Sequence, residues 1–213
     1  MSTKHVNKEM SDVSRHILDV AAIHFAEKGF AGARVDEISA EAGISKSSIY
    51  YRVGDKEALY HGVIVHMISS MLEVTRDRVQ KVSDAREKLD VFIQTTADFV
   101  LSCPHFSPIM MREIASGGAN MSTETLTAMG KLKDYLHEIL QEGTAQGVFR
   151  QVDSGLVHLV IGGAVNFFAA STPIRDKLIQ LSDEHECKCL LIEKEAVVNE
   201  ISEFVYRAVK ADR

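Results

Sequence analysis

Residues 44–52, ISKSSIYYR, place basic, hydroxyl and phenol side chains around two isoleucines. If this segment is a helix, Ile44 and Ile49 face inward and the polar side chains face outward. The outward residues are Lys46, Ser47, Ser48 and Tyr51. Side chains of these types reach base edges and phosphates. The segment could therefore read DNA, although an ordinary pair of packed helices fits the same spacing.

A second cluster with possible chemistry lies near the C-terminus, where His185, Cys187 and Cys189 alternate with other residues. Imidazole and thiolate groups are ligands for zinc and copper(I). No fourth ligand and no CxxC spacing accompany them, so a polar loop is the simpler interpretation. A disulfide between Cys187 and Cys189 would be strained, because only one residue separates them.

Enzyme signatures are absent from the sequence, which contains no GxGxxG, P-loop, HExxH or GxSxG motif. Asp134 and His137 come nearest to the Glu-x-x-His pairs of a di-iron bundle, but a solvated helix face is the simpler interpretation of their spacing. We therefore expect a protein that is not an enzyme and binds neither a cofactor nor a metal.

The composition is that of an ordinary globular chain, with 213 residues of which 46% are hydrophobic and 25% charged. The net charge is −6, yet residues 43–56 carry Lys46, Arg52 and Lys56 against Asp55 alone. A short basic element on an acidic body is compatible with nucleic-acid binding. Sparse cysteines and the polar start of the sequence predict a cytoplasmic protein. The uncharged stretch 154–174 is too short in its apolar part for a membrane span, so a buried or interface helix is expected.

Apolar residues recur with the helical period along most of the chain. The expected helices are 12–28, 35–42, 45–52, 56–81, 84–102, 105–116, 123–146, 153–170, 174–181 and 190–210. Ser11, Asp55 and Asp153 are expected to cap helix starts, and Gly29 and Gly43 to end helices. The sequence predicts an all-α fold, in which three short N-terminal helices precede a larger helical domain.

Residues 12–62 carry a string of residues that matches a known family in register and without a gap. The string comprises Ile17-Leu18, Ala21-Ala22, Phe25, Gly29-Phe30, Val35, Ile38, Ala42 to Ser45, Ile49-Tyr50, Lys56-Glu57 and Leu59. With it, the chain resembles the TetR (tetracycline repressor) family of bacterial transcriptional regulators. The resemblance implies a helix-turn-helix at 35–52 with Lys46 to Tyr51 as recognition helix, and phosphate contacts from Tyr50 and Lys56.

Two departures from the family pattern affect the DNA-binding assignment. Ala33 stands where a hydroxyl residue is usual, which removes one cap and one phosphate contact that Arg34 beside it could supply. Arg52 replaces a common histidine and adds a charge that can bind phosphate.

The resemblance also implies a ligand cavity in the middle of the chain. Aromatic, methionine and polar side chains in 84–116 and 153–170 are spaced so that they could line one cavity, although each also fits an ordinary core. The expected lining is Phe92, Thr96, Phe99, Phe106, Met110, Glu113, Asn166 and Phe167. With Asp98 and Glu113 as the nearby charges, an apolar or weakly cationic effector is expected.

Helices 153–170 and 190–210 carry more apolar residues than one flank of a core requires, and the family pairs its C-terminal helices in a dimer. The expected interface residues are Val157, Val160, Ile161, Ala164, Phe168, Val197, Ile201 and Phe204.

The sequence therefore predicts a DNA-binding domain over residues 1–56 and a ligand-binding and dimerisation domain over residues 57–213. The expected function is a homodimeric repressor that binds a palindromic DNA operator and is released by a small apolar molecule. Alternatives are an activator, a nucleoid-associated protein, or a helical small-molecule-binding or interaction protein without specific DNA binding.

Overall fold

The computed structural model describes residues 11–181 and 193–211. The regular secondary structure of this part of the chain is helical, apart from one isolated bridge between Phe149 and Lys210. Its helices are α1 (Asp12–Gly32), α2 (Val35–Ala42), α3 (Lys46–Arg52), α4 (Lys56–Val79), α5 (Ala85–Ser102), α6 (Phe106–Ala115), α7 (Thr123–Ala145), α8 (Ser154–Ala170), α9 (Thr172–Leu181) and α10 (Lys194–Val209). The all-α expectation is confirmed. His185, Cys187 and Cys189 lie outside the described residues.

Side chains cap the helix starts where the sequence indicated. The Ser11 hydroxyl accepts a hydrogen bond from the Ser14 amide at 3.2 Å. The Asp55 carboxylate accepts from the Ala58 amide at 2.9 Å, and the Asp153 carboxylate from the Leu156 amide at 2.8 Å. Each bond satisfies an amide that the helix itself leaves without a partner.

Gly29 interrupts the first helix where the sequence indicated a stop. It has a φ of 69° and a ψ of 174°, and the chain continues for another turn to Gly32. The result is a kink, which deprives the carbonyl groups just before it of their helical partners. Arg112 of α6 supplies replacement donors, since its guanidinium donates to the carbonyl oxygens of Phe25, Ala26 and Glu27.

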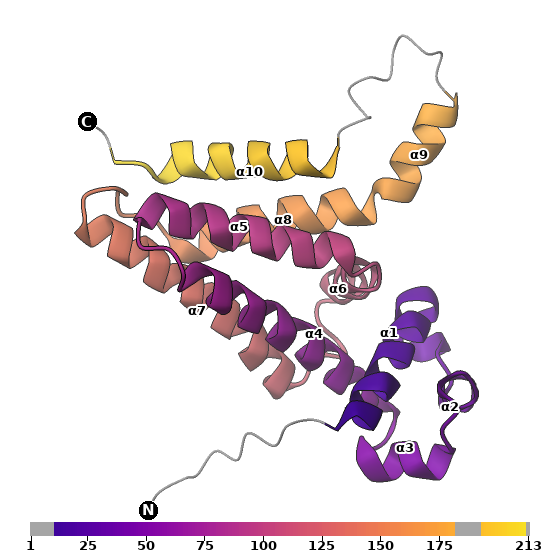
Figure 1. Ribbon diagram of the computed structural model, residues 1–213. Helices are drawn as coiled ribbons and strands as arrows, with labels where there is room; N and C mark the ends of the chain where they lie inside the picture. Colours follow the sequence, from indigo (N-terminus) through magenta and orange to yellow (C-terminus); the bar gives the residue numbers. More distant parts are fainter. Residues whose placement is uncertain (1–10, 182–192, 212–213) are drawn as a thin grey trace, which may run out of the picture.

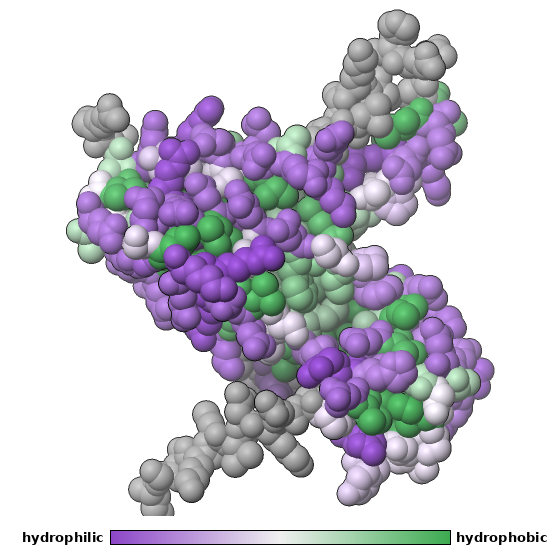
Figure 2. Space-filling view, viewed as in Figure 1, coloured by the Kyte–Doolittle hydropathy of each residue, from purple (hydrophilic) through white to green (hydrophobic). Residues whose placement is uncertain are grey.

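The three N-terminal helices form a lobe that projects from a larger helical body (Figures 1 and 2). Helix α4 joins the two parts, because it packs against α1 at one end and against α5 and α7 along the body. Helix α6 lies between α1 and α8 and contacts both (Figure 1). This arrangement connects the N-terminal lobe to the interior of the body through α4 and α6.

One buried apolar cluster runs through both parts of the molecule. In the N-terminal lobe it includes Phe25, Ile38 and Ile49, and in the body it includes Phe92 and Leu136, all fully buried. Within the described residues no single helix is both long and apolar enough to cross a membrane. Only α8 and α9 taken together, bent by 51° at their junction, reach the required length and composition.

Candidate DNA-binding surface and ligand cavity

A tight turn joins α2 to α3. Gly43 has a φ of 64° and a ψ of 27°, the left-handed conformation that glycine adopts without steric cost. The Ser39 hydroxyl donates to the Ile44 carbonyl at 2.6 Å, and Ser45 caps α3 by accepting from the Ser48 amide. With Ile49 fully buried beneath it, α3 is held against α2 in the geometry of a helix-turn-helix.

The outer side of α3 presents most of the residues that the sequence assigned to DNA contact. Tyr51 is 90% exposed and Tyr50 is 44% exposed. Ser47 and Arg52 are also exposed, whereas Ser48 is half-buried and accepts a hydrogen bond from the Arg52 guanidinium at 3.4 Å. Ile49 therefore lies on the buried side of α3 and most of the polar side chains lie on the exposed side, as the spacing of the isoleucines indicated.

Lys46 has a partner that the sequence did not reveal. Its ammonium lies 2.7 Å from a carboxylate oxygen of Asp36 on α2, in an exposed ion pair. Hydrogen bonding to Lys46 lowers the pKa of Asp36, and the same bond raises the pKa of Lys46. The pair therefore places a negative charge beside the first residue of the recognition helix.

Lys56 and Arg34 flank the helix-turn-helix. The Lys56 ammonium donates to the Ala31 carbonyl at 3.2 Å and lies 4.9 Å from the centre of the Phe30 ring. Arg34 precedes α2 and is exposed, but its side chain does not cap that helix. Both cations sit on the lobe that carries α3.

A small cavity of about 80 Å³ lies inside the body between α4, α5, α6, α7 and α8; we call it the inner cavity. Its lining residues are Ile68, Met71, Phe92, Thr96, Val100, Phe106, Met110, Met129, Leu132, His158, Ile161, Gly162, Val165 and Asn166. No acidic side chain, lysine or arginine is among them. The Thr96 hydroxyl is buried there and has no hydrogen-bond partner among the described residues, and burial lowers the pKa of the His158 imidazole.

Five of the eight residues expected to bind ligand line this cavity, namely Phe92, Thr96, Phe106, Met110 and Asn166. The other three do not. Phe99 packs edge-on against Phe106, and Phe167 is 66% exposed on α8. The Glu113 carboxylate bonds to Tyr60 and Asn120 instead. The residues of α4 and α7 were missed, although the helical period of α4 already marked Ile68 and Met71 as one apolar side.

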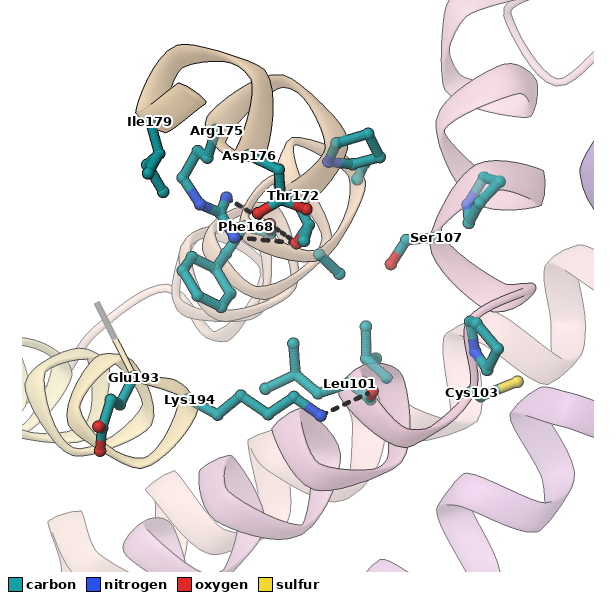
Figure 3. Close-up of a pocket in the computed structure, with 16 residues that line it drawn as sticks. Leu101, Cys103, Ser107, Phe168, Thr172, Arg175, Asp176, Ile179, Glu193 and Lys194 are labelled. Carbon is teal, nitrogen blue, oxygen red and sulfur yellow. Dashed lines mark hydrogen bonds between the residues drawn. The ribbon is translucent and has the colours of Figure 1, made fainter. Parts of the chain in front are cut away.

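A larger pocket of about 760 Å³, the outer pocket, opens between the end of α5, the start of α6, the end of α8, α9 and the start of α10 (Figure 3). Val100 lines both spaces, and the Ser107 hydroxyl of the outer pocket donates to the Asn166 side-chain oxygen of the inner cavity at 3.0 Å. The two spaces therefore share a thin wall.

Two cations line the outer pocket. The Arg175 guanidinium stacks on the Phe168 ring at 3.9 Å and donates to the Phe168 carbonyl, the Ser171 hydroxyl and the Thr172 hydroxyl. The Lys194 ammonium donates to the Leu101 carbonyl at 3.3 Å. The expectation of a weakly cationic effector rested on Asp98 and Glu113 as charges near the ligand. Neither residue lines the inner cavity or the outer pocket, so the structure gives this expectation no support.

Two consecutive residues of α6, Arg112 and Glu113, form hydrogen bonds to α1 and α4. Arg112 holds the kinked end of α1, as described above. Glu113 is buried and accepts from the Tyr60 hydroxyl of α4 at 2.6 Å and from the Asn120 amide groups. Although burial opposes the effect, the hydrogen bonds from Tyr60 and Asn120 lower the pKa of Glu113. Since α6 also contributes Phe106 and Met110 to the inner cavity, one helix touches the cavity, α1 and α4.

An apolar stripe on α8 and α10 faces outward, and we call it the α8–α10 face. It consists of Leu156, Leu159, Val160 and Phe167 on α8 and Phe204 on α10, all exposed. Of the residues that the sequence assigned to a dimer interface, Val160 and Phe204 are exposed. Four more are half-buried, namely Ala164, Phe168, Val197 and Ile201. Val157 and Ile161 were assigned wrongly, because both are buried in the protomer's own core and Ile161 lines the inner cavity.

No group of three or more His, Cys, Asp or Glu side chains in the described part of the chain is arranged to hold a metal ion.

Comparison with known proteins matches the two parts of the chain to two family descriptions. Residues 17–63 match "Bacterial regulatory proteins, tetR family", and residues 86–181 match "Tetracyclin repressor-like, C-terminal domain". The first match covers the helix-turn-helix, and the second covers the helices that enclose most of the inner cavity.

Individual relatives agree with these matches. The HTH-type transcriptional repressor NicS of Pseudomonas putida is 28% identical over 148 residues, 68% of this chain and 70% of that protein. The fatty acid degradation regulator FadR of Bacillus halodurans has a TM-score of 0.74 at 19% identity, covering 93% of this chain and 97% of that one. FadR of Bacillus subtilis in complex with stearoyl-CoA has a TM-score of 0.69 at 18% identity, covering 90% and 97%. At such low identity the two solved structures establish the fold alone.

Proposed function

The chain belongs to the TetR family and is a DNA-binding transcriptional regulator, and on this premise we propose that it is a homodimeric repressor released from its operator by a small molecule. The observation that carries the proposal is the combination of an exposed recognition helix with a mainly apolar cavity in the body, both in contact with elements that α6 connects. We keep residues 1–56 as the DNA-binding domain and residues 57–213 as the sensing and dimerisation domain.

Contact with DNA is assigned to α3 and its flanks. The helix enters the major groove with Lys46, Ser47 and Tyr51 toward the bases, while Tyr50 and Lys56 hold phosphates. Ser48, Arg34 and Arg52 support these contacts from the edge of the surface.

Two copies of the chain are required for useful specificity, because one seven-residue helix reaches few base pairs. The α8–α10 face supplies the contact between them. Leu156, Val160, Gly163 and Phe167 repeat at helical spacing on one side of α8, and Phe204 stands exposed on α10. A two-fold axis through this face pairs the same surface of both copies and produces a palindromic site.

The effector acts through α6. A molecule in the inner cavity displaces Phe106 and Met110, which belong to the same helix as Arg112 and Glu113. Movement of α6 shifts the Arg112 hydrogen bonds to α1 and the Glu113 bond to Tyr60 of α4. Because both recognition helices must enter successive major grooves about 34–36 Å apart, a small rotation of each lobe weakens operator binding.

The DNA-binding assignment is tested with duplexes that the wild-type protein selects from a randomised library. Lys56→Ala should weaken binding to every duplex alike and lower the dependence of log K on log salt by about 0.9. Lys81→Ala, which removes the same charge from an exposed pair with Asp77 in the body, is the matched control. Equal affinity of Lys56→Ala and wild type across several salt concentrations would refute the phosphate contact.

The dimer is tested by placing charge on the α8–α10 face. Leu159 is 70% exposed, so Leu159→Asp should leave the fold intact and yield monomers in analytical ultracentrifugation. Ile114→Asp, at an exposed apolar residue of α6 outside this face, should not change the mass. A Leu159→Asp, Phe204→Asp double variant that sediments as a dimer would show that the interface lies elsewhere.

The coupling role of α6 is tested with Arg112→Lys. A lysine cannot donate to three carbonyl groups at once, so the orientation of the lobe becomes less defined. Affinity for the selected operator should fall, while binding to an unrelated duplex, which needs no fixed spacing, should change little. Arg78→Lys alters an exposed pair with Asp98 and serves as the control. An equal loss on both duplexes would contradict this role.

A further inference from the structure

Thr96 on α5 has a hydroxyl that is buried in the wall of the inner cavity without a hydrogen-bond partner among the described residues. The residue is only 5% exposed. Two other helical threonines donate to the carbonyl oxygen four residues earlier, Thr75 to Met71 at 2.7 Å and Thr144 to Leu140 at 2.8 Å, but Thr96 makes no such bond. A buried hydroxyl without a partner is unfavourable, and a hydrogen bond to a ligand removes that cost.

The other polar side chains that line the inner cavity have partners or access to water. The Asn166 amide donates to the Gly162 carbonyl at 2.9 Å, and its oxygen accepts from the Ser107 hydroxyl at 3.0 Å. His158 is half-buried and also lines a hollow at the surface of the body, so its imidazole has access to water. Thr96 is therefore the polar group of this cavity that gains most from a ligand.

The inner cavity offers no charged partner to a ligand. The described residues of its lining include no aspartate, glutamate, lysine or arginine. Burial lowers the pKa of His158, which disfavours the charged form of the imidazole. An ionised ligand would lose its hydration here and gain no opposite charge, at a cost far above that of an uncharged polar group. The lining therefore selects an uncharged molecule.

The volume of the inner cavity limits the ligand to a compact molecule. It is about 80 Å³, whereas pockets for drug-sized molecules measure about 300–1,000 Å³. An apolar cavity of about 150 Å³ is known to hold one benzene molecule, so a single ring needs all of this space and some movement of its walls.

The walls are of the kind that adapts to an aromatic ring. Met71, Met110 and Met129 line the cavity from three different helices, and flexible methionine side chains adjust to the shape of a ligand. Methionine sulfur makes favourable contacts with aromatic rings, and the rings of Phe92 and Phe106 pack well against another ring. Size and lining together favour one aromatic ring.

We propose that the inner cavity binds one uncharged aromatic molecule of the size of phenol, whose hydroxyl forms a hydrogen bond with Thr96. The inference rests on the proposed function, because it names the class of effector for the same cavity. Phe106 and Met110 move to accommodate the ring. The ligand therefore acts on α6, which carries the hydrogen bonds of Arg112 to α1 and of Glu113 to α4.

The test measures dissociation constants by calorimetry with the full chain and no DNA, at a pH where phenol is uncharged and benzoate is ionised. The other probes are toluene, with a methyl group in place of the hydroxyl, and 1-naphthol, with a second ring. One phenol should bind per chain, about threefold to tenfold more tightly than toluene. Benzoate and 1-naphthol should bind at least about tenfold more weakly than phenol, because of charge and size respectively. Equal binding of phenol and toluene, tighter binding of benzoate or 1-naphthol, or no binding of phenol overturns the proposal.

The hydrogen bond is tested with Thr96→Val, which removes the hydroxyl and keeps a side chain of similar shape. Phenol should bind this variant about threefold to tenfold more weakly, while the affinity for toluene stays unchanged. Thr95→Val is the matched control, because Thr95 is the neighbouring threonine of α5, is 2% exposed and lies outside the lining. It should keep the full preference for phenol. If Thr96→Val also keeps that preference, the hydroxyl of phenol does not bind Thr96 and the assignment is wrong.

The location is tested at Gly162, which lines the inner cavity and where an added Cβ meets no atom within 4 Å. Gly162→Val should fill the cavity and abolish binding of phenol. Gly130→Val, at an equally open helical glycine outside the lining, should leave binding unchanged. Phenol that binds Gly162→Val as tightly as wild type occupies another site, which contradicts the proposal.

Operator affinity, measured separately by fluorescence anisotropy, distinguishes the ligand class from the proposed function. If phenol does not bind and another compound releases the protein from its operator, the ligand class is wrong and the function stands. If phenol binds as described and operator affinity does not change, the ligand class stands and the role of the cavity in release is wrong.

Discussion

The Asp36–Lys46 pair yields the sharpest prediction about DNA recognition. Asp36 carries a negative charge on the surface that approaches the phosphates, and it holds the Lys46 ammonium at 2.7 Å. Both side chains are largely exposed, so water screens their attraction and the pair contributes little to the stability of the fold. Its effect on binding is larger, because it keeps Lys46 from contacting any nearby phosphate and fixes where its donors point.

Asp36→Asn should free Lys46 to neutralise one further phosphate. One added phosphate contact steepens the dependence of log K on log salt by about 0.9, which at 0.1 M salt corresponds to about an eightfold gain in affinity for non-specific DNA. The gain for the selected operator should be smaller, because Lys46 loses its fixed position. The ratio of specific to non-specific affinity should therefore fall.

Glu37→Gln is a matched control, because it removes the same charge from the same helix. Glu37 pairs with Lys28 of α1 at 2.6 Å rather than with the recognition helix. Fluorescence anisotropy at several salt concentrations, on the selected duplex and on an unrelated duplex, measures both slopes and affinities. If Asp36→Asn and Glu37→Gln change binding to the same extent, the effect is one of net charge, and the reasoning about Lys46 is wrong.

Three further predictions concern stability. Gly143→Ala should lower the free energy of unfolding in urea by about 1–3 kcal/mol, because an added Cβ collides with the Phe149 ring. Gly130→Ala should raise it by up to about 1 kcal/mol, because its Cβ meets no atom within 4 Å and alanine favours the helix. Gly43→Ala should cost about 1–2 kcal/mol from backbone strain alone, since its Cβ meets no atom within 4 Å, and an unchanged urea midpoint would refute this. The pKa of His158 is lower in the folded protein than in the unfolded chain, so the unfolded chain binds more protons as the pH falls below 6.5. The free energy of unfolding should therefore decrease in that range. His158→Gln should reduce this decrease, as measured by thermal melts at successive pH values.

The sequence by itself determined the features that depend on neighbours along the chain. Helical period, capping residues such as Asp55 and Asp153, and a glycine that must adopt a left-handed conformation at residue 43 are local properties, so the all-α fold and the helix-turn-helix could be predicted. The inward and outward sides of α3 followed from Ile44 and Ile49 for the same reason.

Only the tertiary structure decided how the helices turn toward one another. Helix α8 is apolar on nearly all sides, so its period could not show that Ile161 lies inward and Phe167 outward. The partners of Glu113, Arg112 and Lys46 come from other helices, and an unpaired group such as the Thr96 hydroxyl is defined by every element around it. Contacts between distant segments depend on the packing of whole helices, and no local pattern in the chain records that packing.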